Sequence, residues 1–393
     1  MERGDRDIVF PTTMEYKRVN VLTTLGIILV AAVTVSFLYF DQDFGNEIGA
    51  AISGSRAAVA TFADNASMQP YKGVPRHIFF HSLVVYPELA YSHDGIVDSN
   101  AKTYEEYMIT RDQFEKILAA LYSNNYVLVD IHSIYGTNAD GTVYQKEPLV
   151  PKGKKPLILS IDDLNYYYDM RGRGFADKLV LDGNGDVATE IVTPDGKTEV
   201  TRDGDIVPIL DDFVKAHPDF SVNGAKGVIA ETGYNGVLGY RTQASSSTDP
   251  AYMTDYRKGQ VTAAEEVVAR LKATGWIFAS HSYSHRDAFS SGAITLDQVQ
   301  TDISEWHDQV QNVVGPTDIF IGPFGQVFKP GDPRRQAYVD AGFRMLAGVG
   351  MDAYLQYFKN AVVMDRADID DLRMTTTPDL LKQYFDAKTI LGQ

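Results

Sequence analysis

The sequence predicts an α/β fold built on a parallel sheet or barrel. Short apolar runs alternate with amphipathic segments along most of the 393 residues, an alternation typical of βαβ units. Hydrophobic residues make up 44% of the chain, which supports a packed core and excludes a disordered or fibrous protein. The formal charge of −16 disfavours a nucleic-acid partner, because an acidic surface repels polyanions. The absence of cysteine excludes disulfides, thiol nucleophiles and cysteine-ligated metals.

The first apolar segment, residues 21–40, contains no charged residue. Twenty helical residues span about 30 Å, the thickness of the hydrocarbon core of a bilayer. A cleaved signal peptide is the alternative, but the segment is long for one and ends in bulky side chains that make a poor cleavage site. Basic residues precede the segment and acidic residues follow it, which favours a cytoplasmic N-terminus. We therefore expect a single-pass protein of the cell membrane, with residues 1–20 in the cytoplasm, an anchor at 21–40, a stalk at 41–74 and an extracellular domain at 75–393.

Strand and helix signals alternate through the expected domain. The strand signals are short apolar runs, whereas the helix signals repeat apolar residues every three or four positions. Thr110 precedes the first clear helix and is its expected N-cap. In chain order, strands are expected at 77–85, 126–129, 156–161, 227–230, 276–279 and 319–321, with two more near 345 and 362, and helices at 110–123, 206–216, 262–273, 296–313 and 333–341.

Residues 178–206 interrupt this alternation. They contain three Asp-Gly pairs separated by β-rich runs, which is typical of an inserted hairpin or a small antiparallel meander. The first pair resembles the start of a calcium-binding loop, but Val187 stands where that loop requires glycine. We therefore expect a structural insert here and no calcium site.

Two strands end in residues that could bind a metal ion. Asp162 and Asp163 follow the strand at 156–161, and two adjacent carboxylates are costly unless they are paired or metal-bound. His281 and His285 follow the strand at 276–279, and their i, i+4 spacing would place both on one face of a helical turn. Each pair alone has a structural explanation, a helix N-cap or ordinary packed histidines. Together they indicate an open site of two histidines and a carboxylate.

With these two motifs, the chain resembles the polysaccharide deacetylases with chitooligosaccharide-deacetylase homology, carbohydrate esterase family four. The strand ending in Asp162-Asp163 is similar to the first motif of that family, 280–285 to the second, and 321–325 to the third. The resemblance covers roughly residues 75 to 370. It implies a distorted (β/α) barrel of the polysaccharide deacetylase type, which removes N-acetyl groups from an extracytoplasmic glycan such as a cell-wall polymer or exopolysaccharide.

The resemblance also implies roles for individual residues. It makes Asp162 the catalytic base. The metal ion would be divalent, with Zn²⁺ as the expectation. The implied metal ligands are Asp163, His281 and His285, and the implied substrate-binding residues are Pro323, Phe324 and Gly325.

The chain departs from the family pattern in its proton-transfer residues. The arginine of the third motif falls on Ile321, for which Arg366 is a candidate substitute, and no histidine after His307 can supply the general acid of the fifth motif. We predict that His81, late in the first strand, acts as the acid in its place, with His132 as a second candidate. The alternative function is a catalytically impaired deacetylase-like protein that binds glycan without turnover. No phosphate-binding motif is present, so no nucleotide partner is expected.

Overall fold

The computed structural model describes residues 67–92, 98–244 and 255–393. The chain divides into two units, Met1–Thr61 and Phe62–Gln393, and all described residues belong to the second. The expected cytoplasmic segment, the anchor at 21–40 and most of the expected stalk therefore lie outside the described residues. Within the described ranges, no helix has both the length and the hydropathy needed to cross a membrane.

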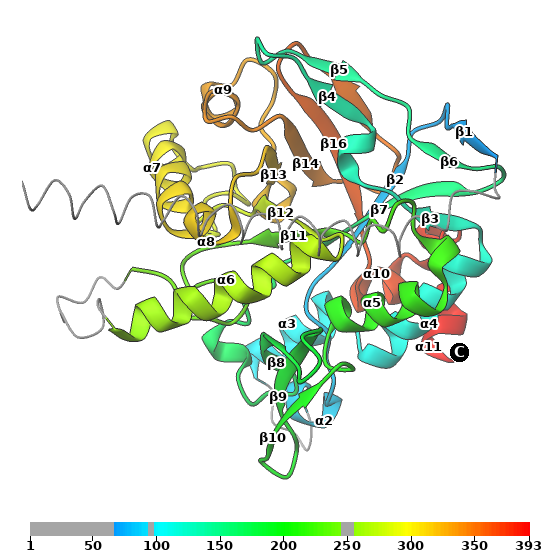
Figure 1. Cartoon of the computed structure of the whole chain (residues 1–393), viewed down its shortest axis with the longest axis vertical. Coiled ribbons are helices and arrows are strands. Elements are labelled where there is room, and N and C mark those ends of the chain that lie inside the picture. Colours follow the sequence, from blue (N-terminus) through cyan, green and yellow to red (C-terminus); the bar gives the residue numbers. More distant parts are fainter. Residues whose placement is uncertain (1–66, 93–97, 245–254) are drawn as a thin grey trace, which may run out of the picture. The chain divides into compact units, whose positions relative to one another are not determined.

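Seven parallel strands close into a barrel, which confirms the fold expected for this part of the chain (Figure 1). The strands are mostly apolar and are largely buried on both faces, as parallel strands covered by helices usually are. The barrel closes because β7 pairs with both β2 and β11. In spatial order the strands are β11 (Val228–Glu231), β12 (Ile277–Ser280), β13 (Ile319–Ile321), β14 (Met345–Val349), β16 (Val362–Asp368), β2 (Arg76–Phe80) and β7 (Lys155–Asp162).

Smaller strands extend the barrel. β3 (Tyr126–Leu128) pairs with the first half of β7, leaving the second half for β11. Strand pairing begins at Met68, where β1 (Met68–Pro70) pairs antiparallel with β6 (Leu149–Pro151). Sequence patterns did not predict β1, β6, the β4–β5 hairpin (Tyr135–Thr137 and Val143–Gln145) or β15 (Leu355–Tyr357), each only three residues long.

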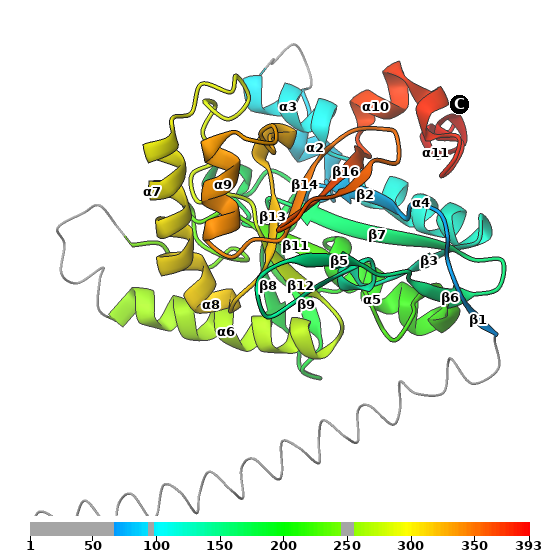
Figure 2. The same cartoon turned by 90° about the horizontal axis from the view of Figure 1, so that it is seen from above.

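Helices surround the barrel, with α6, α7 and α9 on one side and α4, α10 and α11 on the other (Figures 1 and 2). Thr110 caps α4 as predicted, in a capping box with Gln113, and Thr295 caps α7 in the same way. The predicted helix 296–313 is α7 followed by a π-helical turn at His307–Gln311 and then α8. The helices are α2 (Pro87–Ala90), α3 (Ser99–Tyr107), α4 (Arg111–Ser123), α5 (Ile206–Ala216), α6 (Arg257–Ala273), α7 (Leu296–Trp306), α8 (Asn312–Val314), α9 (Pro333–Asp340), α10 (Asp371–Thr376) and α11 (Ala387–Leu391).

The interrupting segment is a three-stranded antiparallel meander of β8 (Ala176–Leu181), β9 (Val187–Val192) and β10 (Thr198–Thr201). The Asp-Gly pairs at 182–183 and 195–196 lie in its two turns. The meander interpretation of 178–206 is therefore confirmed.

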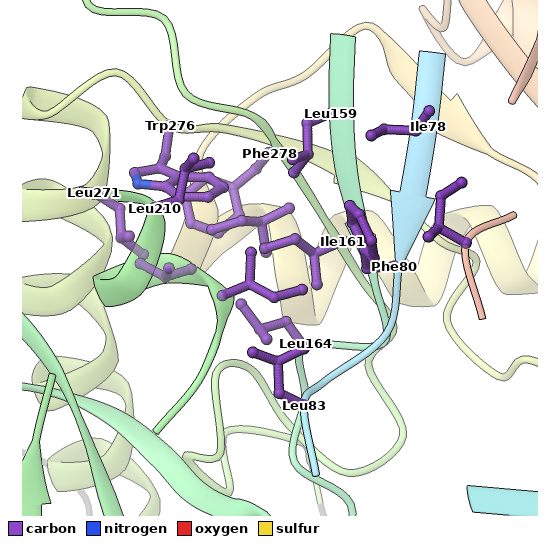
Figure 3. Close-up of a cluster of buried hydrophobic side chains, with 14 of the residues drawn as sticks. Ile78, Phe80, Leu83, Leu159, Ile161, Leu164, Leu210, Leu271, Trp276 and Phe278 are labelled. Atoms are coloured by element: carbon purple, nitrogen blue, oxygen red, sulfur yellow. The ribbon is translucent and has the colours of Figure 1, made fainter. Parts of the chain in front are cut away.

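Side-chain alternation divides each barrel strand between two cores. On β7, Leu159 and Ile161 point outward, toward Trp276 and the covering helices (Figure 3). Ile158 points into the barrel with apolar residues of the neighbouring strands. Ser160 and Asp162 have the same parity as Ile158, so the last two inward positions of β7 are polar. This alternation places a buried carboxylate inside one end of the barrel.

His132, the second candidate acid, does not lie at that end of the barrel. It is held between two carboxylates elsewhere. Its Nδ1 is 3.0 Å from Asp130 and its Nε2 is 2.9 Å from Asp318. Tyr135 also donates to Asp318, at 3.0 Å. Burial opposes protonation of His132, but the two carboxylates outweigh it and raise its pKa to about 9. With both ring nitrogens engaged, His132 acts as a structural cation joining β3 to β13.

We expect this clamp to weaken at alkaline pH. The pKa of His132 is raised above the ordinary 6.5, so its stabilisation is complete below pH 6.5 and lost as the pH rises through about 9. The side chain is 42% exposed, so the loss should be about 1 kcal/mol or less. Urea denaturation of the wild type and the His132→Gln variant at several pH values should show the two free energies of unfolding converging as the pH rises. A constant difference between them would contradict this assignment.

Candidate metal centre and active site

The carboxyl ends of β7 and β12 bring Asp163, His281 and His285 together. The Asp163 Oδ2 atom lies 3.9 Å from His281 Nε2 and 3.8 Å from His285 Nε2. One ligand atom from each residue lies within 4.8 Å of the other two. In the described part of the chain, this is the one group of three or more histidine or acidic residues with that geometry. The two motifs that the sequence singled out thus converge on one point.

The loop carrying the histidines differs from the prediction. Residues 281–285 are not a helical turn, because Ser282 and His285 adopt left-handed backbone conformations with φ of 61° and 45°. The buried carboxylate of Asp302 on α7 holds the loop by accepting from the backbone N–H groups of Tyr283 and Ser284, at 2.8 and 2.9 Å. Such strained conformations are concentrated at functional sites, where the surrounding structure enforces them.

His281 is oriented by a backbone carbonyl. Its Nδ1 lies 2.9 Å from the Ile321 oxygen, and a carbonyl can only accept, so Nδ1 carries the proton. The Nε2 lone pair therefore faces the carboxylates. Burial lowers the pKa of His281, although Asp162 and Asp163 oppose the shift. A neutral imidazole fixed in this way is the usual form of a metal-ligating histidine.

Asp163 accepts a hydrogen bond from the Tyr167 hydroxyl, which orients it. Burial alone would raise the pKa of Asp163, but His285, His281 and a hydrogen bond from the Tyr167 hydroxyl lower it. The same hydroxyl lies 2.9 Å from Thr232 Oγ1. The donor set is therefore two imidazole nitrogens and one supported carboxylate, which fits a divalent transition-metal ion.

Asp162 points into the barrel, where Arg366 of β16 clamps it. Two parallel hydrogen bonds, of 2.7 and 2.9 Å, join the guanidinium to the two carboxylate oxygens. Arg366 also donates to Ser160 and lies over the Phe79 ring, and it is almost fully buried. Burial opposes ionisation of Asp162, but the Arg366 guanidinium outweighs it and holds the pKa of Asp162 below its usual range. The candidate substitute for the arginine of the third motif thus contacts the expected base, from a different strand.

His81 borders the cluster but lies beyond its strand, because β2 ends at Phe80 and not at 85 as predicted. Its Nδ1 lies 3.1 Å from the carbonyl oxygen of Tyr107. Because a carbonyl oxygen can only accept, Nδ1 carries a proton, and Nε2 is the nitrogen that can exchange one. His81 is close enough for its charge to lower the pKa of both Asp162 and Asp163.

The third motif forms a tight turn beside His285. Pro323–Gly325 is a 3₁₀ turn in which Phe324 has a φ of 54° and is 52% exposed. The Phe324 ring lies 4.6 Å from the His285 ring. Gly325 has a φ of 77°, and a Cβ there would lie 2.9 Å from the Val349 side chain, so glycine is required. The motif thus presents an aromatic face next to the histidines.

Sequence reasoning missed several residues around the cluster. Tyr167 belongs to a tyrosine run whose function a single sequence does not distinguish from packing, and Asp302 carries no local signal. Glu231 did carry one, because it ends the apolar strand β11 just as Asp162 ends β7. Burial, and to a smaller extent the charge of Asp163, raise the pKa of Glu231 well above its ordinary value.

No family description matches the chain, and no curated protein matches it. Several solved structures are similar to it at low identity. The Streptococcus pyogenes deacetylase PplD, solved in complex with acetate, is 14% identical, with a TM-score of 0.42 over 81% of this chain and 99% of that one. A de-N-acetylase from Aggregatibacter actinomycetemcomitans is 15% identical, with a TM-score of 0.42 over 79% and 99%. IcaB from Ammonifex degensii is 12% identical, with a TM-score of 0.40 over 80% and 97%. All of these TM-scores are below 0.5.

Proposed function

We propose that this chain is a metal-dependent deacetylase that hydrolyses N-acetyl groups of an extracytoplasmic glycan, with Zn²⁺ as its metal ion. The observation that carries the proposal is the convergence of Asp163, His281 and His285 beside an arginine-clamped Asp162. Two histidines and one carboxylate leave a coordination position open, as catalytic zinc sites do. When bound, the ion supplies a Lewis acid that polarises the amide carbonyl and lowers the pKa of water.

Two residues of the chain then carry out the two proton transfers of the reaction. Asp162 is ionised and takes a proton from the attacking water, while Arg366 holds its two oxygens in place. Amide hydrolysis breaks the C–N bond and releases acetate, and the departing amine needs one proton. In its doubly protonated form, His81 gives that proton from Nε2, since its Nδ1–H is hydrogen-bonded to the Tyr107 carbonyl oxygen.

Exposed aromatic rings support a sugar substrate. Phe324 touches His285 on one side of the cluster. Tyr234 is 40% exposed and stacks on Tyr167, which holds Asp163. Rings of this kind combine a flat apolar face with, in tyrosine, a polar tip, and both suit the faces and hydroxyls of a hexose.

His81 can be tested by substitution with glutamine. We expect the His81→Gln variant to lose about 10²–10⁴-fold in turnover while it retains its metal ion, because glutamine cannot give up a proton. Initial rates of acetate release and metal content measure the two effects separately. Turnover equal to that of the wild type would assign the proton to solvent or to another group.

The turnover experiment decides between the enzyme and its alternative. The full chain should release acetate from N-acetylated chitooligomers, lose this activity with a chelator and regain it when Zn²⁺ is added. If the oligomers bind but no acetate is released at any zinc loading, the chain is a catalytically impaired protein that binds glycan without turnover.

The proposed location depends on residues 21–40 as a membrane anchor, with the cytoplasm on the N-terminal side. Protease added to intact cells should then release a fragment that begins after about residue 41, given the length needed to span a bilayer. A domain protected until the cells are lysed would contradict the proposed extracellular location.

A further inference from the structure

A cavity of about 690 Å³ lies between α7, α9 and the turn at 358–361, which joins β15 to β16. Figures 1 and 2 show α7 and α9 side by side on one side of the barrel. Asp163, His281 and His285 are not among the residues that line this cavity. Its volume lies within the range of about 300–1,000 Å³ that small-molecule sites occupy.

The cavity wall contains an arginine whose guanidinium has no hydrogen-bond or ion-pair partner among the described residues. Arg335 of α9 is only 7% exposed, and its guanidinium lies over the Phe358 ring at 4.1 Å. In the described ranges of the chain, no hydrogen bond and no ion pair reaches this guanidinium, although it carries five N–H donors. The aromatic ring satisfies none of those donors, so they are available to a ligand in the cavity.

The acidic groups in the wall are already engaged. Asp332 caps α9 and pairs with Arg334 at 2.6 Å, and Asp340 accepts from Gln336 at 2.7 Å. The wall also holds one unmet acceptor, because the side-chain oxygen of Asn360 is buried without a hydrogen-bond partner. A matching ligand would therefore bring an oxyanion to Arg335 and a hydroxyl donor to Asn360.

We propose that this cavity binds a small sugar that carries a carboxylate or a phosphate group. The planar guanidinium matches either oxyanion with two parallel hydrogen bonds. The Phe358 ring and the Asn360 amide would contact the body of the sugar and its hydroxyls. This site is separate from the proposed metal centre and does not depend on the proposed deacetylase activity.

Calorimetric titration of the metal-free full chain with glucuronate, glucose 6-phosphate and glucose tests the proposal. We expect one or both charged sugars to bind about tenfold or more tightly than glucose. The charged sugar that binds more tightly identifies the oxyanion. The His281→Ala variant should bind like the wild type, because the metal centre takes no part.

Two variants test the residues. Arg335→Gln should weaken binding of the charged sugars by about tenfold or more, because the guanidinium charge is lost. Since this change also disturbs the packing on Phe358, Asn360→Asp provides a second test: it leaves Arg335 in place and should weaken the anions by charge repulsion. Equal affinity for glucose and the charged sugars, binding that is unaffected in Asn360→Asp, or binding that is lost in His281→Ala would each overturn the proposal.

Discussion

Replacing Asp162 by asparagine should lower the turnover of an N-acetylated glycan by about 10²–10⁴-fold, the usual contribution of a general base. Asparagine has nearly the same shape and keeps an oxygen for Arg366, but it cannot take a proton from water. The metal content should not change, because Asp163, His281 and His285 remain. Initial rates of acetate release and metal analysis of the purified full chain measure both quantities.

A remote carboxylate provides the matched control for this change. Asp219 accepts a hydrogen bond from Tyr122 at 2.9 Å and is half exposed, and it belongs to no part of the candidate site. The Asp219→Asn variant should turn over like the wild type. If the Asp162→Asn variant retained more than about a tenth of the wild-type rate, a general-base role of ordinary size would be excluded.

Replacing Arg366 by methionine should destabilise the fold by about 3–5 kcal/mol, because it leaves the Asp162 carboxylate buried without its partner. Both side chains of this pair are almost fully buried, with 1% of Arg366 and 4% of Asp162 exposed. The free energy of unfolding in urea measures the loss.

A double variant separates loss of the ion pair from loss of packing. In Asp162→Asn/Arg366→Met both charges are gone, so part of the lost stability should return relative to Arg366→Met alone. A loss below about 1 kcal/mol in the single variant would contradict the clamp. A double variant less stable than Arg366→Met would assign the effect to packing.

The sequence predicted those features that depend on local chemistry. Thr110 caps its helix because a threonine followed three residues later by glutamine satisfies two backbone N–H groups, whatever the rest of the fold does. The apolar runs predicted the barrel strands because buried parallel strands carry apolar side chains on both faces. Asp163, His281 and His285 converge because parallel strands place their carboxyl ends at the same end of the barrel.

The remaining features depend on contacts between distant segments. The spacing of His281 and His285 suggested a helical turn. They lie instead in a loop, which is held by hydrogen bonds to Asp302 of α7, a helix further along the chain. Ile321 occupies the position of the expected arginine. Arg366 reaches Asp162 because the sheet order sets β16 beside β2, one strand away from β7. No local pattern encodes that neighbourhood.

The metal centre itself is tested most directly by zinc binding. Equilibrium dialysis of the full chain against Zn²⁺, with metal analysis, should give one ion per chain. The His281→Ala variant should bind zinc more weakly by over about 100-fold, since changes to outer-shell residues alone cost about 10–100-fold. The control variant His217→Ala, at the C-terminal end of α5, should bind like the wild type. A His281→Ala protein that binds zinc with the stoichiometry and affinity of the wild type would contradict the assignment.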